Sequence, residues 1–281
     1  MLEILLMSRS LARLLHGLSF LITAPQSPRR RAMTLSRLVQ GLEVSTAATI
    51  QTRRGPLKVL PIRGPHLAAA AIAFDDEEPE LLDWIDAMGP GETLWDVGSA
   101  TGLFAMYAAL RPDAGAVHAF EPKATSFGVL IEHLALNGMG EKVFPLCVAL
   151  SDRTGLTHLS LASMAPGSGG NSVDGQPNQF GETHSVFQQG VPGYRMDDFA
   201  AAFGLAPPDH LKIDVDGVEG MILRGGPETL KAVKSVLIEV EGDNADQAAT
   251  RIEPPLLAAG LVEDIAVRTA GSGRNRLYRQ V

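Results

Sequence analysis

The fold of this chain is decided by residues 94–102, which read LWDVGSATG. The apolar start, residues 94–97, has the length and composition of a short buried strand. Gly98 and Gly102 enclose a loop, and the apolar run over 103–110 predicts a short helix. The stretch therefore predicts the first strand–loop–helix unit of an α/β domain.

The sequence on either side continues this alternation. Further strands are predicted at 116–120, 143–150, 210–214 and 235–241, and a closing hairpin from 261–267 and 276–279. Helices are predicted over 77–88 and 124–136, over 220–233 with an interruption at Gly225-Gly226-Pro227, and over 245–259 with a break at Pro254-Pro255. Such alternation implies parallel strands joined by right-handed crossovers. We therefore predict an α/β fold with a Rossmann-like, doubly wound, mostly parallel sheet that has an antiparallel strand at its edge.

The composition excludes several classes of protein. The 281 residues are 45% hydrophobic and 20% charged, which excludes a wholly disordered or fibrous chain. A net charge of −8 gives no indication of nucleic-acid binding. The single cysteine, Cys147, excludes a disulfide framework and is typical of a reducing compartment, so we expect a cytoplasmic protein.

Positive charge is concentrated at the start of the chain. Residues 1–63 contain ten basic and two acidic side chains, whereas the remainder contains 14 basic and 30 acidic ones. We therefore divide the chain into a basic N-terminal extension, residues 1–63, and a main domain, residues 64–281.

The first 22 residues are predicted to form an amphipathic helix, because leucine and isoleucine recur at helical spacing over residues 11–22. Charged residues interrupt the apolar run, so it resembles neither a membrane-spanning helix nor a signal peptide. Two interpretations remain open. Either the helix packs on its own domain, or residues 1–31, which end in three arginines, rest on the inner face of an anionic membrane or on a partner.

Two acidic residues bracket the glycine loop. Asp96 stands near the end of the first strand, and Glu121 follows the second strand, 23 residues after Gly98. In open parallel sheets, ligands bind beyond the carboxyl ends of the strands. Glu121 can accept hydrogen bonds from both ribose hydroxyls, and Asp96 suits an ammonium group. The glycines let the backbone approach a ligand, and the amides at the helix start favour an anionic group.

The predicted ligand is therefore a nucleoside that carries both an amine and a carboxylate, and S-adenosylmethionine fits this description. A dinucleotide is disfavoured because the pattern G-x-G-x-x-G fails here. Asp96 and Thr101 interrupt it, and an acid would face the pyrophosphate.

Four ordered motifs resemble those of the FkbM-type methyltransferases. They are DVGSATG at 96–102, HAFEP at 118–122, ALSD at 149–152 and LKIDVDGVEG at 211–220. The resemblance covers residues 77–241. It implies a class I S-adenosylmethionine-dependent fold and methyl transfer, usually to a hydroxyl of a sugar, glycan, glycolipid or natural product. The chain departs from the family's common Ala-Asn at Ser99-Ala100, and from its common Glu at Asp216.

Positions in this fold suggest which residues bind the cofactor. The residues that we expect are Asp96, Gly98, Ser99, Gly102, Glu121, Leu150, Ser151 and Asp152. Leu150 and Ser151 would flank the adenine. Asp152 would accept a hydrogen bond from the adenine amino group or, alternatively, cap a turn.

The candidate catalytic residues are Asp214, at the end of the fourth strand, and His184, in the glycine-rich segment 165–193, which we expect to be a mobile loop or a lid. His210 is a rival candidate for the base, and Asn171 and Tyr194 are candidate substrate contacts. We expect no metal. The alternative is a cation held by Asp214, Asp216 and Glu241.

We therefore expect an enzyme, an S-adenosylmethionine-dependent O-methyltransferase with a small-molecule or glycan hydroxyl as acceptor. The alternative is a non-catalytic module that binds a nucleoside or a partner on the same fold. A nicotinamide-dependent dehydrogenase lacks its motif. The sequence leaves open which acceptor is used and whether the chain forms a homodimer.

Overall fold

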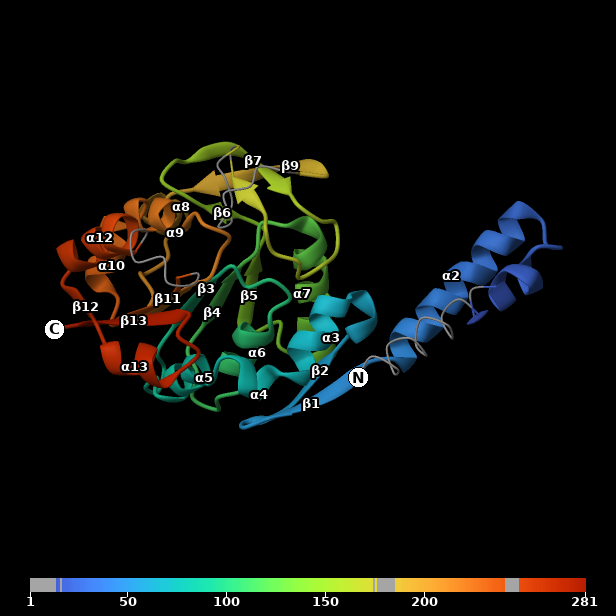
Figure 1. Ribbon diagram of the computed structural model, residues 1–281, viewed down its shortest axis with the longest axis horizontal. Helices are drawn as coiled ribbons and strands as arrows, with labels where there is room; N and C mark the ends of the chain where they lie inside the picture. Colours follow the sequence, from blue (N-terminus) through green and yellow to red (C-terminus); the bar gives the residue numbers. More distant parts are fainter. Residues whose placement is uncertain (1–13, 16, 174, 176–184, 241–247) are drawn as a thin grey trace. The chain divides into compact units, whose positions relative to one another are not determined.

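A computed structural model of the chain describes residues 14, 15, 17–173, 175, 185–240 and 248–281 (Figure 1). Its contacts divide the chain into two compact units, Met1–Ala47 and Ala48–Val281. The first unit is helical. Residues 14, 15 and 17–23 are helical, a turn follows at 24–26, and α2 (Pro28–Ser45) begins with a proline, whose missing N–H costs no helical hydrogen bond there.

The second unit begins earlier than the main domain predicted from charge. Strands β1 (Ala48–Thr52) and β2 (Gly55–Val59) form an antiparallel hairpin. Leu57 and Val59 are fully buried in the core of this unit. Residues 48–63, which the charge pattern grouped with the extension, therefore pack with the second unit, because apolar burial and not charge decides where a hairpin docks.

A seven-stranded sheet of order β12-β13-β11-β10-β3-β4-β5 forms the centre of the second unit. Its strands are β3 (Leu94–Val97), β4 (Val117–Phe120), β5 (Val143–Leu146), β10 (His210–Ile213), β11 (Ser235–Glu239), β12 (Leu261–Glu263) and β13 (Asn275–Gln280). Strand β13 runs antiparallel to both of its neighbours, β11 and β12, and the other neighbouring strands are parallel. The predicted mostly parallel sheet is confirmed, with the antiparallel strand one place inside the edge. The two closing strands pair as predicted, but the strand predicted over 261–267 ends at Glu263, and residues 265–267 are helical.

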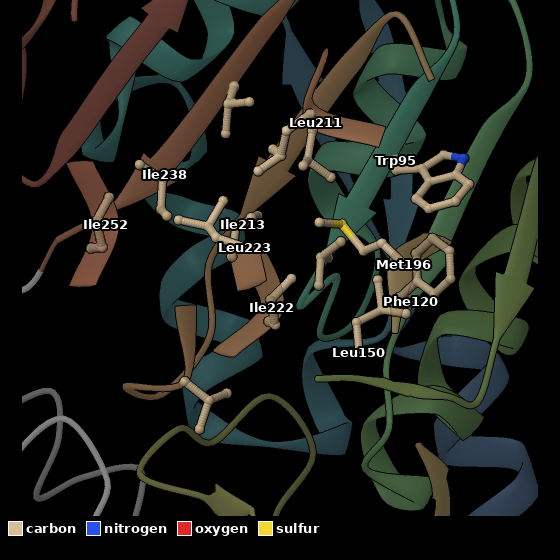
Figure 2. Packing of buried hydrophobic residues seen from close by; sticks show 14 of the residues in the cluster. Trp95, Phe120, Leu150, Met196, Leu211, Ile213, Ile222, Leu223, Ile238 and Ile252 are labelled. Atoms are coloured by element: carbon tan, nitrogen blue, oxygen red, sulfur yellow. The ribbon is translucent and has the colours of Figure 1, made fainter. Parts of the chain in front are cut away.

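Helices cover both faces of this sheet. Neighbouring strand residues alternate between two cores: Trp95 and Val97 belong to one, and Leu94 belongs to the other. The core with Trp95 contains Phe120 and Met196 and is shown in Figure 2. Its helices are α8 (Met196–Phe203), α9 (Glu219–Arg224), α10 (Pro227–Ala232) and α12 (Glu253–Ala258). The opposite core holds α3 (Pro65–Ile72), α4 (Phe74–Glu77), α5 (Pro79–Asp86), α6 (Leu103–Ala109) and α7 (Ala124–Asn137), and α13 (Ile265–Ala270) packs on α5.

Three of the predicted helices are interrupted. The helix predicted over 77–88 is divided between α4 and α5, and the one over 220–233 between α9 and α10. The helix over 245–259 is described from residue 248, as a π-helical turn (Ala248–Ile252) followed by α12. A proline stands in the first turn of α5, α10 and α12, because proline cannot donate the hydrogen bond that would continue the preceding helix.

A second sheet of order β6-β9-β7-β8 was not predicted. Its strands are β6 (Ala149–Leu150), β7 (Gly155–Leu161), β8 (Ser172–Val173) and β9 (Phe187–Tyr194). The single strand predicted over 143–150 is thus divided between β5 of the main sheet and β6 of this one. The glycine-rich segment 165–193, predicted as one loop, contains β8 and most of β9, while residues 174 and 176–184 lie outside the described part.

Candidate active site

A cavity of about 260 Å³ lies at the carboxyl ends of β3, β4 and β10. Gly98 follows β3, Glu121 follows β4, and Asp214 follows β10, and all three line the cavity. The second sheet and the loop 165–171 supply further lining residues. The cavity therefore lies where ligands bind in open α/β sheets, beyond the carboxyl ends of the parallel strands.

Glu121 is the buried acid of this cavity. Its Oε2 accepts a hydrogen bond from the Ala100 N–H, and its Oε1 accepts one from the Lys123 N–H, both at 2.8 Å. Burial nevertheless raises the pKa of Glu121 to about 8. Each carboxylate oxygen has two lone pairs, so Glu121 can accept two more hydrogen bonds from a ligand while it keeps both backbone contacts.

Gly98 and Gly102 are required by the protein itself. Both have positive φ, +80° and +86°. A Cβ on Gly98 would lie 1.8 Å from the main-chain oxygen of Asp214, and one on Gly102 would lie 2.2 Å from Leu130 Cδ1. The first glycine therefore lets the ends of β3 and β10 approach each other, and the second lets the loop pack on α7. The sequence predicts that these glycines let a ligand approach the backbone, whereas in the structure they let parts of the chain approach each other.

The cavity also has apolar lining residues. Leu150 of β6, Leu159 of β7, Val173 of β8 and Ile222 of α9 line it together with Glu121 and Asp214. A ligand in the cavity could therefore contact both hydrocarbon and hydrogen-bonding groups. Asn171 Oδ1, also in the lining residues, is buried and has no hydrogen-bond partner among the described residues. It is an acceptor available to a ligand.

The loop 165–171, which supplies lining residues of the cavity, is held by two charged side chains and by Ser126, whose Oγ accepts a hydrogen bond from the Gly167 N–H at 3.0 Å. Lys123 is 2% exposed, and its ammonium donates to Ala165 O at 2.8 Å, Ser168 O at 3.2 Å and Ser168 Oγ at 2.6 Å. At the other end, Asp216 Oδ2 accepts hydrogen bonds from Asn171 N at 2.8 Å and Asn171 Nδ2 at 3.1 Å. Two charged side chains thus fix a glycine-rich loop, which would otherwise have many conformations.

Replacing Lys123 by methionine is expected to release this loop. The loss of a charged donor with three acceptors should raise amide exchange in residues 165–171 by about tenfold or more, since one such hydrogen bond stabilises by about 1.5–3 kcal/mol. Hydrogen–deuterium exchange with mass spectrometry measures this directly. Lys142→Met is the control, because Lys142 donates to a main-chain oxygen elsewhere in the unit, Ala109 O at 3.3 Å. Unchanged exchange in the Lys123 variant would contradict the anchoring role.

A buried ion cluster surrounds Lys212 of β10, beside the cavity. Lys212 Nζ lies 3.2 Å from Asp96 Oδ1 and 3.0 Å from Asp214 Oδ2. Burial alone would lower the pKa of Lys212, but the carboxylates of Asp214 and Asp96 outweigh it and raise that pKa. Lys212 therefore stays protonated and links the ends of β3 and β10.

Glu239, the last residue of β11, is hydrogen-bonded to Asp214. Burial and the charge of Asp214 raise the pKa of Glu239. Burial would also raise the pKa of Asp214, but the Lys212 charge and the hydrogen bonds from Glu239 and Lys212 lower it. The pair therefore holds its proton on Glu239 and leaves Asp214 ionised. The Asp214 side chain keeps 30% of its surface accessible, so an anionic acceptor faces the cavity.

Of the predicted cofactor and catalytic residues, the structure brings four to the cavity: Gly98, Glu121, Leu150 and Asp214. Asn171, a candidate substrate contact, and Asp216, a candidate cation ligand, line it as well. The other predicted cofactor residues do not line it: Asp96, Ser99, Gly102, Ser151 and Asp152. Asp96 is fully buried against Lys212, and Asp152 pairs with Arg224 at 2.9 Å. Tyr194 packs in an aromatic cluster with Phe199 and Phe203.

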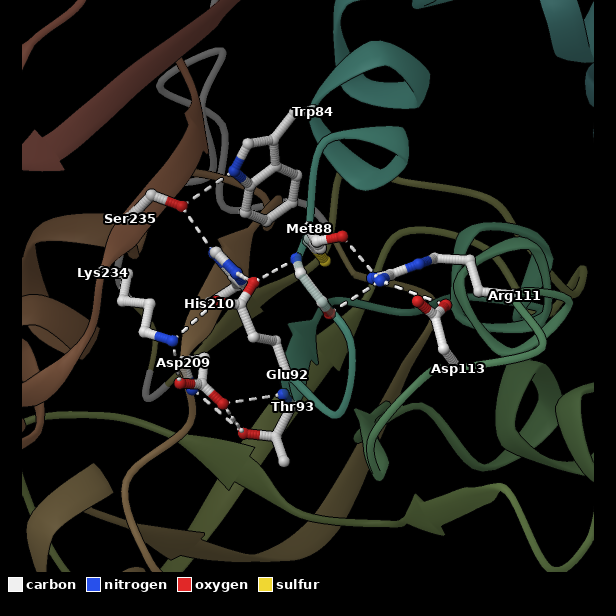
Figure 3. Close-up of polar contacts among 11 residues, drawn as sticks. Trp84, Met88, Glu92, Thr93, Arg111, Asp113, Asp209, His210, Lys234 and Ser235 are labelled. Atoms are coloured by element: carbon white, nitrogen blue, oxygen red, sulfur yellow. Dashed lines mark hydrogen bonds and ion pairs between the residues drawn. The ribbon is translucent and has the colours of Figure 1, made fainter.

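His210 lies at the wrong end of its strand to act as a base. It is the first residue of β10, whereas Asp214 follows the last one. Its Nε2 lies 2.8 Å from Glu92 Oε2 and its Nδ1 lies 2.7 Å from Ser235 Oγ, in the polar network of Figure 3. That network links the amino ends of β10 and β11 and has a structural function.

Two predicted residues lie outside the described residues. They are His184, a candidate catalytic residue, and Glu241, one of the three carboxylates considered for a cation. Within the described part of the chain, no group of three or more His, Cys, Asp or Glu side chains is arranged to hold a metal ion. The roles of Lys123 and Glu239 were not predicted from the sequence. Lys123 is a charged residue directly after the Glu121-Pro122 motif, and Glu239 is a charged residue at the end of an apolar strand, and no other feature of the sequence indicated them.

The strand order of the main sheet, with the antiparallel strand β13 next to the edge, and the cavity at the carboxyl ends of β3, β4 and β10 define a class I methyltransferase fold. A family model, the Methyltransferase FkbM domain, matches residues 96–263. The chain therefore belongs to the FkbM methyltransferase family, and the resemblance noted from the four motifs is confirmed.

Two relatives and one solved structure illustrate the similarity. Hexuronic acid methyltransferase AglP of Haloferax volcanii is 26% identical over 165 residues, which are 57% of this chain and 61% of that protein. The 31-O-demethyl-FK506 methyltransferase FkbM of Streptomyces tacrolimicus is 26% identical over 219 residues, 65% of this chain and 83% of that protein. The crystal structure of Methyltransferase FkbM from Methylobacillus flagellatus has a TM-score of 0.44 and 13% identity, and the match covers 67% of this chain and 43% of that one.

Proposed function

We propose that this chain transfers a methyl group from S-adenosylmethionine to a hydroxyl group of a sugar, glycan, glycolipid or other natural product. Membership of the family supports methyl transfer. The observation that carries the choice of donor is Glu121, a buried carboxylate with free lone pairs, in a cavity that Leu150, Leu159 and Val173 also line. A nucleoside needs this combination, an acceptor for the ribose hydroxyls and an apolar surface for the base.

The name of one relative supports an oxygen acceptor, because it refers to 31-O-demethyl-FK506. The other relative is named for a hexuronic acid, a sugar acid that has both hydroxyl and carboxyl groups. We infer that this chain acts on the same chemical class, a hydroxyl on a sugar or on a natural product, and that the acceptor reaches the cavity on the side of Asp214.

In the proposed reaction, S-adenosylmethionine would supply an electrophilic methyl group: its sulfur–methyl bond would break as the oxygen–methyl bond forms, and S-adenosylhomocysteine would leave. Glu121 would hold the ribose and so fix the position of the donor, and alignment of this kind contributes up to about 7–11 kcal/mol. Asp214, kept ionised by Lys212, accepts the proton that the hydroxyl loses as its oxygen is methylated. A weak base suffices, because the alkylated oxygen is a strong acid before it loses that proton.

Two measurements test this proposal. Isothermal titration calorimetry should show binding of S-adenosylhomocysteine and no binding of NAD. Incubation with a labelled methyl donor and extracted glycans and lipids should give a labelled product. Binding of NAD in place of S-adenosylhomocysteine would contradict the choice of donor. Tight binding of S-adenosylhomocysteine without transfer to any hydroxyl-bearing fraction would favour the alternative, a non-catalytic nucleoside-binding module.

A further inference from the structure

The first unit has no apolar core among its described residues. Thr23 is its one buried residue there, at 3% exposed. Two side chains of α2 contact the residues before it: Thr34 Oγ1 donates to Gln26 Oε1 at 2.9 Å, and the Arg31 guanidinium lies 4.7 Å from the centre of the Phe20 ring. A pair of helices that folds around an apolar core would instead bury its apolar side chains.

The apolar side chains of the first segment form one stripe. The large residues at helical spacing are all more than half exposed: Leu14 68%, Leu15 57%, Leu18 52%, Leu21 70% and Ile22 60%. Helix α2 adds four more exposed residues, namely Met33, Leu38, Val39 and Leu42. Single exposed leucines are ordinary, but a continuous exposed apolar stripe indicates a surface that another apolar phase covers.

The charge of the same segment indicates which kind of surface could cover the apolar stripe. Residues 14–45 contain four arginines, Arg29, Arg30, Arg31 and Arg37, and one acidic residue, Glu43. Two copies of the segment would repel each other, so self-association through it is disfavoured. An anionic lipid surface provides both a hydrocarbon layer for the leucines and negative charge for the arginines.

We propose that residues 14–45 dock the protein on an anionic lipid surface, with the leucine stripe in the interfacial layer and the arginines at the headgroups. No helix among the described residues is long and apolar enough to span a membrane, so the segment would lie on the surface. Residues 48–281 contain 18 basic and 30 acidic side chains, and this excess of negative charge would be repelled by the same surface. The attachment therefore depends on the first unit and is independent of the proposed methyl transfer.

Vesicle sedimentation with the full chain tests this inference. The protein should sediment with vesicles of phosphatidylcholine and phosphatidylglycerol in equal parts, bind pure phosphatidylcholine much more weakly, and be released by added salt. The double variant Leu18→Ser, Leu21→Ser and the double variant Arg30→Glu, Arg37→Glu should each weaken binding by about tenfold or more. These side chains are exposed, so circular dichroism should show a folded protein in both cases.

Matched controls change equally exposed residues of the second unit. Ile72→Ser with Leu156→Ser removes two apolar side chains that are 86% and 82% exposed, and Lys231→Glu reverses a surface charge. Both controls should bind vesicles as the unchanged chain does. Equal binding by all variants, or no binding to anionic vesicles at all, would overturn the proposal. So would a change of oligomeric state in the leucine variant by light scattering, because the stripe would then be a protein interface.

Discussion

Replacing Glu121 by glutamine is expected to weaken S-adenosylhomocysteine binding by about a hundredfold. Each hydrogen bond from a ribose hydroxyl to a charged acceptor stabilises by about 1.5–3 kcal/mol, and each 1.4 kcal/mol is about tenfold in affinity. The amide retains one acceptor oxygen, but its NH₂ group would face the backbone N–H of Ala100 or Lys123, both of which now donate to the carboxylate. Isothermal titration calorimetry measures the loss.

Glu141→Gln is the matched control, because Glu141 is an exposed acid of the same unit that does not line the cavity. Its affinity should equal that of the unchanged chain. If Glu121→Gln binds S-adenosylhomocysteine equally well, Glu121 does not hold the ribose, and the proposed orientation of the donor is wrong.

The raised pKa of Glu121 also predicts that the affinity for S-adenosylhomocysteine depends on pH. Burial raises the pKa of Glu121 to about 8 in the free protein. Ligand hydroxyls donate to the ionised carboxylate, so binding lowers this pKa and releases a proton below a pH of about 8. Affinity should therefore rise as the pH approaches this value from below and level off above it. Calorimetry in buffers of different ionisation enthalpy counts the proton, and Glu121→Gln should abolish this part of the dependence.

The second large effect is expected on stability. Replacing Lys212 by methionine would leave Asp96 and Asp214 without the cation that lies 3.2 Å and 3.0 Å from them. Breaking a buried ion pair by removing one partner costs about 3–5 kcal/mol, because the remaining charge has no compensation. The free energy of unfolding from urea denaturation should fall by this amount.

Lys231→Met provides the control for Lys212. Lys231 pairs with Glu228 at 2.7 Å, but both side chains are more than half exposed. Exposed pairs of this kind contribute about 0–1 kcal/mol. If the two variants lose the same free energy of unfolding, the cluster around Lys212 does not stabilise the sheet as we infer.

The central sheet could be predicted from the sequence because its strands are short apolar runs with clear breaks. Residues 94–97 are an example, followed by Gly98, and in residues 235–239 the apolar run lies between Ser235 and Glu239. The second sheet could not be predicted. Its strands β7 and β9 pair residues that are 26 to 38 positions apart, and the intervening segment is rich in glycine and lacks apolar periodicity.

The site residues also divide into those that the sequence could locate and those that it could not. Gly98, Glu121, Leu150 and Asp214 stand at strand ends, and the rule that ligands bind at the carboxyl ends of parallel strands locates them. Asp96 stands within β3, two residues before Gly98, and its carboxylate is fully buried against Lys212, so it does not line the cavity. Glu239 joins Asp214 from a neighbouring strand, and such a contact depends on strand order, which the spacing of motifs does not give.

The most direct test of the account is a crystal structure of the full chain with S-adenosylhomocysteine. We predict that the ribose hydroxyls will contact Glu121, that the adenine will lie against Leu150, Leu159 and Val173, and that the sulfur will face Asp214. Density for the nucleoside outside this cavity, or a ribose that does not touch Glu121, would contradict the central claim.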